Sequence, residues 1–184
     1  MNITVLMNDK EFFSLGCRNK VNEEEEHCHM KKGDYLAIDV AKHTLNHVDR
    51  LEKNITNLKL QKILYYIQAQ SLKQNDKPLF SNPIEAWRHG PVVRSVYNYY
   101  REYTNRPITE LEDTWDSFTK GEKRLMDSVI ENLIDKDEWD LVRRTHGEAP
   151  WKSVYEKGSS NEITLKSIKD YFANRDIIIK KGSF

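Results

Sequence analysis

Cysteine, glycine and proline are all scarce in this chain, and neither sign of charge predominates. Two cysteines among 184 residues are too few for the disulfide framework of a small secreted domain. The seven glycines never form the clusters that hold phosphate in nucleotide-binding loops. Lys and Arg together number 29, as do Asp and Glu, so the formal net charge is zero. This balance removes the overall positive field that a dedicated nucleic-acid-binding protein carries.

Long hydrophobic runs are also missing. No apolar stretch approaches the ~18–20 residues that are needed to cross a bilayer. The first residues show no basic region followed by an apolar stretch and a cleavage site. We therefore expect no membrane partner and a cytoplasmic location.

Large aromatic residues, by contrast, are plentiful: four Trp, nine Tyr and six Phe. Interleaved with Leu, Ile and Val, they offer enough apolar surface to build a core at ~25 cal/mol per Å² buried. A length of 184 residues suits one domain. The sequence therefore predicts a folded, highly charged domain.

Apolar residues recur at helical spacing along most of the chain. Three threonines stand where helices begin, and Thr119 with Glu122 forms a capping box. We expect Gly147 to end a helix in the left-handed conformation. The sequence predicts an all-α (mainly α) fold, a single compact helical domain of about six to eight helices. Its one candidate strand is Ile177-Ile178-Ile179 near the C-terminus. Helices are expected over 34–51, 56–68, 83–90 (a short element), 92–103, the stretch after Thr119, the stretch around Trp139, the turn at Pro150-Trp151 and the stretch after Thr164.

Residues 1–29 show no convincing periodicity, and we interpret them as a disordered or wrongly included leader. Glu23 to Glu26 imply a purine-rich run of codons shortly before Met30, which resembles a bacterial ribosome-binding site. Our hypothesis is that translation starts at Met30, and a flexible acidic tail is the alternative. The helical domain is then expected over 30–175 and a C-terminal tail over 176–184.

No pattern in the chain indicates an enzyme or a bound metal. His27, Cys28 and His29 are adjacent, which matches no paired zinc-ligand spacing. His43 and His47 lie four apart with Thr at position 44, where a zinc protease needs Glu, so a solvated polar face is the better interpretation. The run 145–148 places Thr, His and Glu too close in sequence for a catalytic triad. We expect no catalytic residue, no cofactor and no metal.

Trp87-Arg88-His89-Gly90-Pro91 is the most informative short stretch. Its Gly-Pro break predicts a tight corner between two helices. One interpretation is a buried tryptophan at a structural corner. The other is a protein-binding surface together with the tyrosine-rich helix that follows, because Trp, Tyr and Arg dominate interface energetics.

Three ordered blocks resemble the Panacea domain, which defines a family of SocA-like antitoxins and phage-associated proteins. The first is Ile55-Thr56-Asn57-Leu58-Lys59-Leu60-Gln61-Lys62-Ile63-Leu64-Tyr65-Tyr66-Ile67-Gln68. The second joins Pro78-Leu79-Phe80 to Glu85-Ala86-Trp87-Arg88-His89-Gly90-Pro91-Val92-Val93 and Val96-Tyr97, and the third is Thr145-His146 with Pro150-Trp151-Lys152. The resemblance covers residues 34–174 and departs from the family pattern at Ile67 and Gly147.

The resemblance implies an antitoxin of a type II-like toxin–antitoxin system, which neutralises a cognate protein toxin by direct contact. A family member that delivers its toxin to a AAA+ protease implies such a protease as a second partner. The alternatives are a DNA-binding autoregulator, although Lys59, Lys62 and Arg94 are scattered singly, and a phage-encoded interaction protein without a toxin partner. The candidate partner-binding residues are Gln61, Tyr65, Trp87, Arg88, His89, Gly90, Pro91, Tyr97, Tyr99, Tyr100, Thr145, His146 and Trp151.

Overall fold

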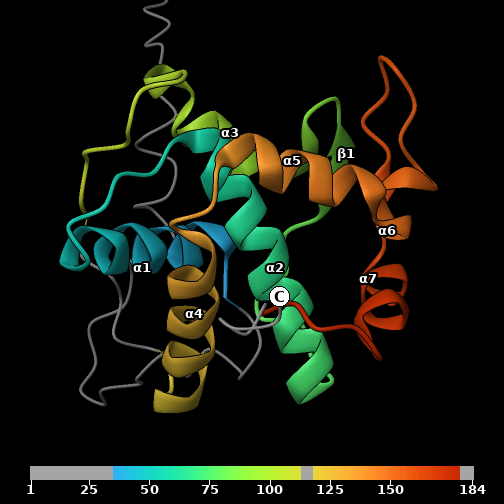
Figure 1. Cartoon of the computed structure of the whole chain (residues 1–184), viewed down its shortest axis with the longest axis horizontal. Helices are drawn as coiled ribbons and strands as arrows, with labels where there is room; N and C mark the ends of the chain where they lie inside the picture. Colours follow the sequence, from blue (N-terminus) through green and yellow to red (C-terminus); the bar gives the residue numbers. More distant parts are fainter. Residues whose placement is uncertain (1–34, 113–117, 179–184) are drawn as a thin grey trace, which may run out of the picture.

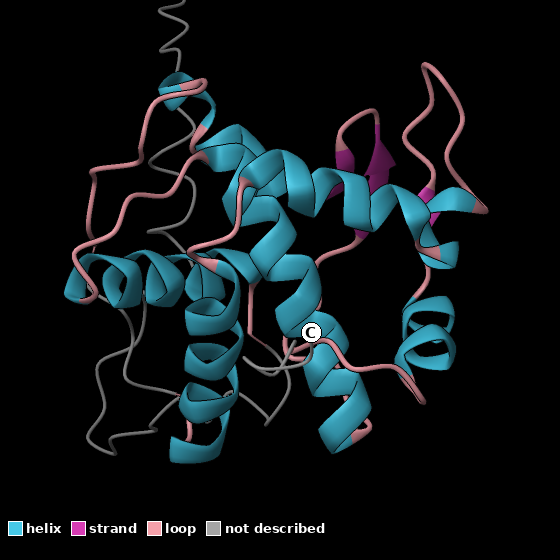
Figure 2. Cartoon of the chain, in the orientation of Figure 1, coloured by secondary structure: helices cyan, strands magenta, loops and turns pink. Residues whose placement is uncertain are grey.

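A computed structural model describes residues 35–112 and 118–178 of the chain. Within these ranges helices predominate, which confirms the mainly α fold and the expected number of helices (Figures 1 and 2). Three short strands form a small sheet beside them. The elements are α1 (Ala37–Arg50), α2 (Asn57–Asn75), β1 (Ile84–Trp87), β2 (Gly90–Val92), α3 (Arg94–Tyr99), the 3-10 helix η1 (Arg101–Tyr103), α4 (Lys120–Leu133), α5 (Glu138–Gly147), α6 (Ala149–Lys152), β3 (Glu162–Ile163) and α7 (Leu165–Phe172).

Helix α2 lies at the centre of the molecule, and the other elements surround it (Figure 1). Every residue from Leu60 to Leu72 is buried, since α1, α4, α5, α7 and β2 all contact this helix. Its buried polar side chains need partners within the fold. The Gln68 side chain, for example, accepts from the Leu79 amide at 2.8 Å and donates to the Phe80 carbonyl at 2.9 Å.

The three expected helix caps are confirmed. The Thr56 hydroxyl accepts from the Lys59 amide at the start of α2, and the Thr164 hydroxyl accepts from the Ser167 amide at the start of α7. Thr119 and Glu122 form the capping box of α4. Each cap satisfies an amide that has no partner within its own helix, so the sequence placed these three starts correctly.

The prediction of a short helix over 83–90 is wrong, because these residues belong to a β-hairpin. Strand β1 pairs antiparallel with β2 on one side and with β3 on the other. Trp87 pairs with Gly90, which leaves Arg88 and His89 as the two-residue turn. Burial alternates along β1 with the period of two that is typical of a strand lying on a core.

The helix expected over 92–103 is also shorter than predicted. Val92 belongs to β2, so α3 begins only at Arg94, and its end passes into η1. Gly147 does not take the left-handed conformation: among the described glycines only Gly90 and Gly158 have a positive φ. The chain instead leaves α5 in extended conformation at Glu148 and enters α6 at once.

The strand expected over 177–179 does not form in its described part. Ile177 is buried in the hydrophobic core but belongs to no strand. Ile179 lies outside the described residues. The leader over 1–29, with its cysteines, and the end of the tail also lie outside them. None of the helices in ranges 35–112 and 118–178 combines the length and apolarity needed to span a membrane.

Candidate functional site

The tip of the β1–β2 hairpin carries two exposed side chains, Arg88 and His89, held above a tightly packed base. Gly90 follows them with a φ of +100°, a conformation that side chains disfavour. A Cβ atom at this position would lie 2.7 Å from Oγ1 of Thr145 and 2.8 Å from Cε of Lys62. Glycine is therefore required both by the turn and by the close approach of α2 and α5.

Gln61 and Lys62 bind the hairpin from α2. Oε1 of Gln61 accepts from the Val93 amide, and Nζ of Lys62 donates to the Pro91 carbonyl, each at 2.9 Å. Both side chains are buried. The expectation that Gln61 contacts a partner is corrected, because its polar group is used inside the fold; Gly90 and Pro91 are buried with it.

Burial alone lowers the pKa of the Lys62 ammonium to about 7. Taking a charged group out of water costs free energy, which favours the neutral amine. The Lys62 amine that holds the hairpin therefore loses its proton more readily than the amine of an exposed lysine.

Trp151 on α6 fixes the other side of the hairpin. Its Nε1 donates to the Trp87 carbonyl at 2.9 Å. Its ring stacks on His146 and on Tyr155, with centroid distances of 4.1 and 4.4 Å. Burial lowers the pKa of the half-buried His146 imidazole, and Lys62 lowers it further. Trp151 is buried, so the expectation that it contacts a partner is corrected. Its indole instead fixes the hairpin to α6.

Three further candidates lie in the interior. Thr145 is fully buried and donates to the Val142 carbonyl. Tyr65 packs edge-on against Tyr66 and Phe172. Tyr100, which we expected on an aromatic surface, is buried too. These residues build the core around α2, and none can touch a partner without unfolding.

The remaining candidates lie on or beside the hairpin, where Trp87 is half-buried and Tyr97 of α3 is exposed. The Trp87 ring meets Tyr97 at 5.0 Å, and the Arg94 guanidinium lies over the same ring at 5.2 Å. Arg94 in turn forms a double hydrogen bond with Glu85. At the turn, His89 meets the exposed Trp139 ring edge-on at 5.5 Å. We call this surface the hairpin face; its residues are Trp87, Arg88, His89, Tyr97 and Trp139.

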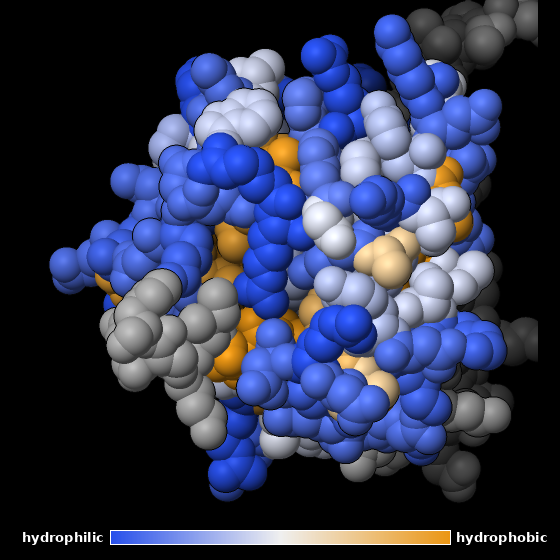
Figure 3. Space-filling view, turned by 45° about the vertical axis from the view of Figure 1, so that its right-hand side comes forward, coloured by the Kyte–Doolittle hydropathy of each residue, from blue (hydrophilic) through white to orange (hydrophobic). Residues whose placement is uncertain are grey.

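Trp139 was missed by the sequence reasoning, although a signal for it exists. In α5 the buried residues are Leu141, Val142 and Thr145, and Trp139 lies out of phase with them. With 46% of its surface exposed, it is a large apolar group that packing does not explain. Figure 3 shows the face that it views as largely hydrophilic, with hydrophobic surface in small patches between hydrophilic side chains.

Tyr99, the last exposed candidate, points away from the hairpin face. Its hydroxyl donates to Glu112 at 2.6 Å, and Glu112 also pairs with Lys42 of α1. Because Tyr97 and Tyr99 are two residues apart in one helix, their side chains leave it on opposite sides. Tyr99 therefore anchors the loop after η1.

The histidines of α1 are not solvated as expected. His43 is buried and its Nε2 lies 2.8 Å from Asp127 of α4, while His47 lies 3.1 Å from the same carboxylate. The polar face of α1 is thus covered by α4. In the part of the chain that the structure describes, no group of His, Cys, Asp and Glu is arranged to hold a metal.

Comparison with known proteins gives a consistent result. The model of a family described as "Antitoxin SocA-like, Panacea domain" matches residues 60–152, just over half of the chain. A stretch of 61 residues is 38% identical to Antitoxin SocA of Caulobacter vibrioides (strain NA1000 / CB15N). This stretch covers 33% of the chain and 32% of that relative, so the similarity spans about a third of each. No solved structure matches the chain significantly.

Proposed function

The chain belongs to the SocA-like antitoxin family that is defined by the Panacea domain, and from this premise we propose that it neutralises a cognate protein toxin by direct contact. The observation that supports the mode of action is the hairpin face. Exposed Trp, Tyr and Arg side chains on a rigid support are the groups that contribute most to protein–protein binding. The face requires no catalytic group, so the proposal is a stoichiometric binder and not an enzyme.

The base of the hairpin explains how the face is kept ready to bind. The hairpin is fixed by hydrogen bonds from Gln61, Lys62 and Trp151. A surface that is already ordered loses little conformational entropy on association. The residues of the family match therefore act at two levels: buried ones position the hairpin, and exposed ones contact the toxin.

A growth-rescue assay tests this function. The toxin candidate encoded beside this gene is expressed in bacteria with or without the chain, and wild-type chain is expected to restore growth. Trp139→Ala and Arg88→Ala should weaken rescue at unchanged protein level and unchanged melting temperature, because both side chains are exposed. Tyr99→Ala is the matched control, since it removes an exposed aromatic residue on the other side of α3 and should retain rescue.

The same assay separates two modes of neutralisation. If the chain masks the toxin, toxin abundance stays constant while growth recovers. If it delivers the toxin to a AAA+ protease, toxin abundance falls and rescue is lost in a strain without that protease. Full rescue by a double variant Arg88→Ala/Trp139→Ala would remove the hairpin face from the proposal.

A further inference from the structure

The turn of the β1–β2 hairpin carries a cation that the fold does not use. The Arg88 side chain is exposed and forms no ion pair or hydrogen bond within ranges 35–112 and 118–178. Its backbone, in contrast, is held in place: the His146 imidazole is hydrogen-bonded to the Arg88 backbone, and the neighbouring Trp87 carbonyl accepts from Trp151. A free guanidinium on a fixed backbone loses little entropy when a partner binds it.

The two other arginines beside the hairpin are already neutralised. The Arg94 guanidinium forms a double hydrogen bond with Glu85, through Nε at 2.9 Å and Nη2 at 2.6 Å. On α5, Arg143 pairs with Asp140, three residues before it. Arg88 is therefore the arginine of this region whose charge no side chain among the described residues compensates.

The carboxylates around the hairpin face are engaged as well. Glu85 accepts from Nε1 of Trp87 at 2.7 Å in addition to its ion pair. Glu138 accepts from the Thr56 hydroxyl at the start of α2. Asp137 caps α5, because its Oδ1 accepts from two backbone amides of the first turn. These acceptors are used inside the fold, so the surroundings of Arg88 offer donors without matching acceptors.

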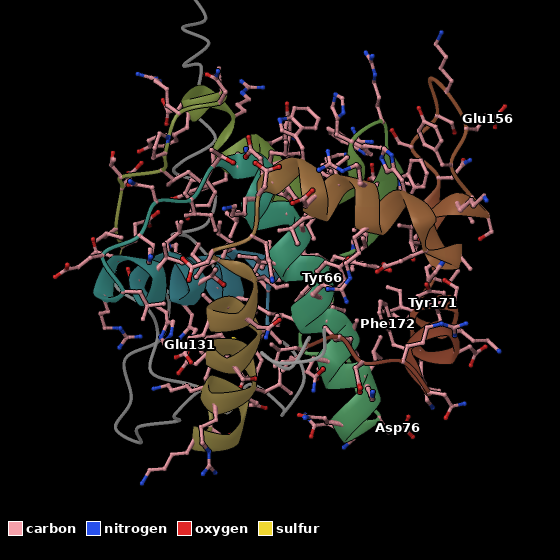
Figure 4. All side chains as sticks on the ribbon, viewed as in Figure 1. Tyr66, Asp76, Glu131, Glu156, Tyr171 and Phe172 are labelled. Carbon is pink, nitrogen blue, oxygen red and sulfur yellow. The ribbon has the colours of Figure 1, made fainter. Side chains whose placement is uncertain are left out.

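Other acidic residues lie elsewhere on the molecule. In Figure 4, Asp76 and Glu131 are in the lower half of the view, whereas the hairpin is at the top. Glu156 lies on the loop between α6 and β3, at the right-hand edge of the view. None of the acidic residues that Figure 4 labels is at the hairpin turn.

The unused polar groups of the hairpin face can all donate a hydrogen bond. The Arg88 guanidinium and the Trp139 indole can only donate, and the Tyr97 hydroxyl and the His89 imidazole can donate too. None of the four side chains has a hydrogen-bond partner in the described part of the chain. A partner that fits this face must supply acceptors, and a carboxylate is the acceptor that matches the planar guanidinium best, through two parallel charge-assisted hydrogen bonds.

We propose that the hairpin face recognises an acidic segment of the cognate toxin. A carboxylate of that segment accepts from Arg88, and apolar groups beside it pack against Trp139 and Tyr97. This inference rests on the proposed function and adds the chemistry of the partner. Phosphate groups of a nucleic acid are the other source of anionic acceptors, but their binding depends on several unpaired cations that displace counterions together, whereas this face has one unpaired arginine.

The association rate of the toxin encoded beside this gene with the immobilised full chain tests the proposal. Attraction between exposed charges weakens as salt screens it, so association should slow steeply when NaCl is raised from ~50 to ~500 mM. Arg88→Glu should slow association at the lower salt concentration by roughly tenfold or more, at unchanged melting temperature. Arg88→Lys keeps the charge without the planar guanidinium, so it should associate at nearly the wild-type rate and dissociate several-fold faster.

Arg124→Glu is the matched control. Arg124 is an exposed residue of α4, and its replacement changes the net charge by the same amount as Arg88→Glu. Association should stay at the wild-type rate, because the attraction acts at the hairpin face. Equal slowing by both variants would show that only net charge matters and would overturn the assignment to Arg88.

The remaining outcomes separate this inference from the function on which it rests. If the wild-type chain forms no complex with the toxin, the proposed function fails and the acidic partner fails with it. If a complex forms at a rate that neither salt nor Arg88→Glu changes, only the acidic partner is overturned. Poly-L-glutamate should compete with the toxin for the wild-type chain. Stronger competition by a single-stranded thymidine oligonucleotide at equal charge would favour a nucleic acid and overturn the proposal.

Discussion

Lys62 and Gly90 meet at the base of the hairpin, and each is there for a different physical reason. Lys62 provides a long side chain whose amine reaches the Pro91 carbonyl from the central helix. Gly90 has no Cβ atom, and this absence lets the Lys62 side chain and Thr145 come close to the backbone. Both effects are local, and both can be measured by single substitutions.

The first prediction concerns the pH dependence of stability. The pKa of Lys62 is about 7 in the fold, against 10.5 for an exposed lysine. Between these values the unfolded chain binds a proton that the folded chain does not. The free energy of unfolding should therefore rise with pH in this window, by up to about 1.4 kcal/mol per pH unit. The part of the free energy of unfolding that comes from neutral Lys62 is lost as pH falls toward 7.

Urea denaturation at pH 7, 8 and 9 measures this slope. Lys62→Met keeps the length of the side chain without its charge, so the slope should become nearly flat. The comparison between the two chains isolates Lys62 from other titrating groups. Identical slopes in both would show that Lys62 stays charged in the fold.

The second prediction compares two glycines. Gly90→Ala forces a side chain into a positive φ and against Thr145, so it should destabilise the fold by roughly 2–5 kcal/mol. Gly121→Ala in the first turn of α4 meets nothing closer than 3.9 Å and should be neutral or stabilise by up to about 1 kcal/mol. Denaturant midpoints of both variants check the pair, and a neutral Gly90→Ala would contradict the packing.

Residue types predicted the site only in part. The stretch 87–91 was identified from its unusual composition, and Arg88 and His89 are indeed exposed. Gln61, Tyr65, Tyr100 and Thr145 are buried instead, because a polar or amphipathic side chain can serve a surface or an interior hydrogen bond equally well. Which of the two it does depends on neighbours that are distant in sequence, such as Val93 for Gln61.

At the scale of elements, helices with strong local signals were predicted and the sheet was not. Thr119 with Glu122 defines a helix start within four residues, so local sequence suffices. The sheet depends on pairing between β1 and β3, which are far apart along the chain. No strand here exceeds four residues in the described part, which is too short for alternation to stand out against the helical pattern.

The third prediction concerns the docking of the hairpin as a unit. Trp151→Phe keeps the aromatic stack but removes the Nε1 donor to the Trp87 carbonyl. Losing this bond should cost about 1–3 kcal/mol and loosen the hairpin locally. Hydrogen–deuterium exchange should then become faster in a peptide that covers 84–93, while α4 remains protected.

Trp139→Phe is the control for this experiment. It alters an exposed tryptophan that makes no hydrogen bond to the hairpin in the described residues, so exchange over 84–93 should stay as in the wild type. If Trp151→Phe also leaves this exchange unchanged, the indole bond does not hold the hairpin.

At the scale of the whole molecule, the fourth prediction uses the charge balance to distinguish the proposed function from DNA binding. The chain carries 29 basic and 29 acidic residues, and many basic side chains are already paired, such as Arg94 with Glu85. DNA affinity depends on unpaired cations that displace counterions from phosphate. We predict no binding of a labelled duplex from the upstream region, measured by fluorescence anisotropy at 0.15 M salt with up to ~1 µM protein. Tight binding that weakens steeply with salt would favour the autoregulator.

The three sequence blocks of the family converge on one place in the molecule, and only the complete fold shows it. The first contributes Gln61 and Lys62, the second the hairpin, and the third Thr145 and Trp151. The resemblance predicted that these blocks matter together. It could not predict that most of their residues support the hairpin, while Trp139, which lies outside the three blocks, is the exposed aromatic residue beside its turn.

The hydrogen bond between Trp151 and the Trp87 carbonyl joins residues that are 64 positions apart. During synthesis this separation delays the formation of the bond. At the ~5–20 residues per second of translation, roughly 3–13 s pass between the addition of Trp87 and that of Trp151. Throughout this interval the hairpin exists without its indole support, and Trp139 arrives only near the end of it. A nascent chain therefore acquires its completed hairpin face only after α6 has left the ribosome, well after the central helix is available to fold.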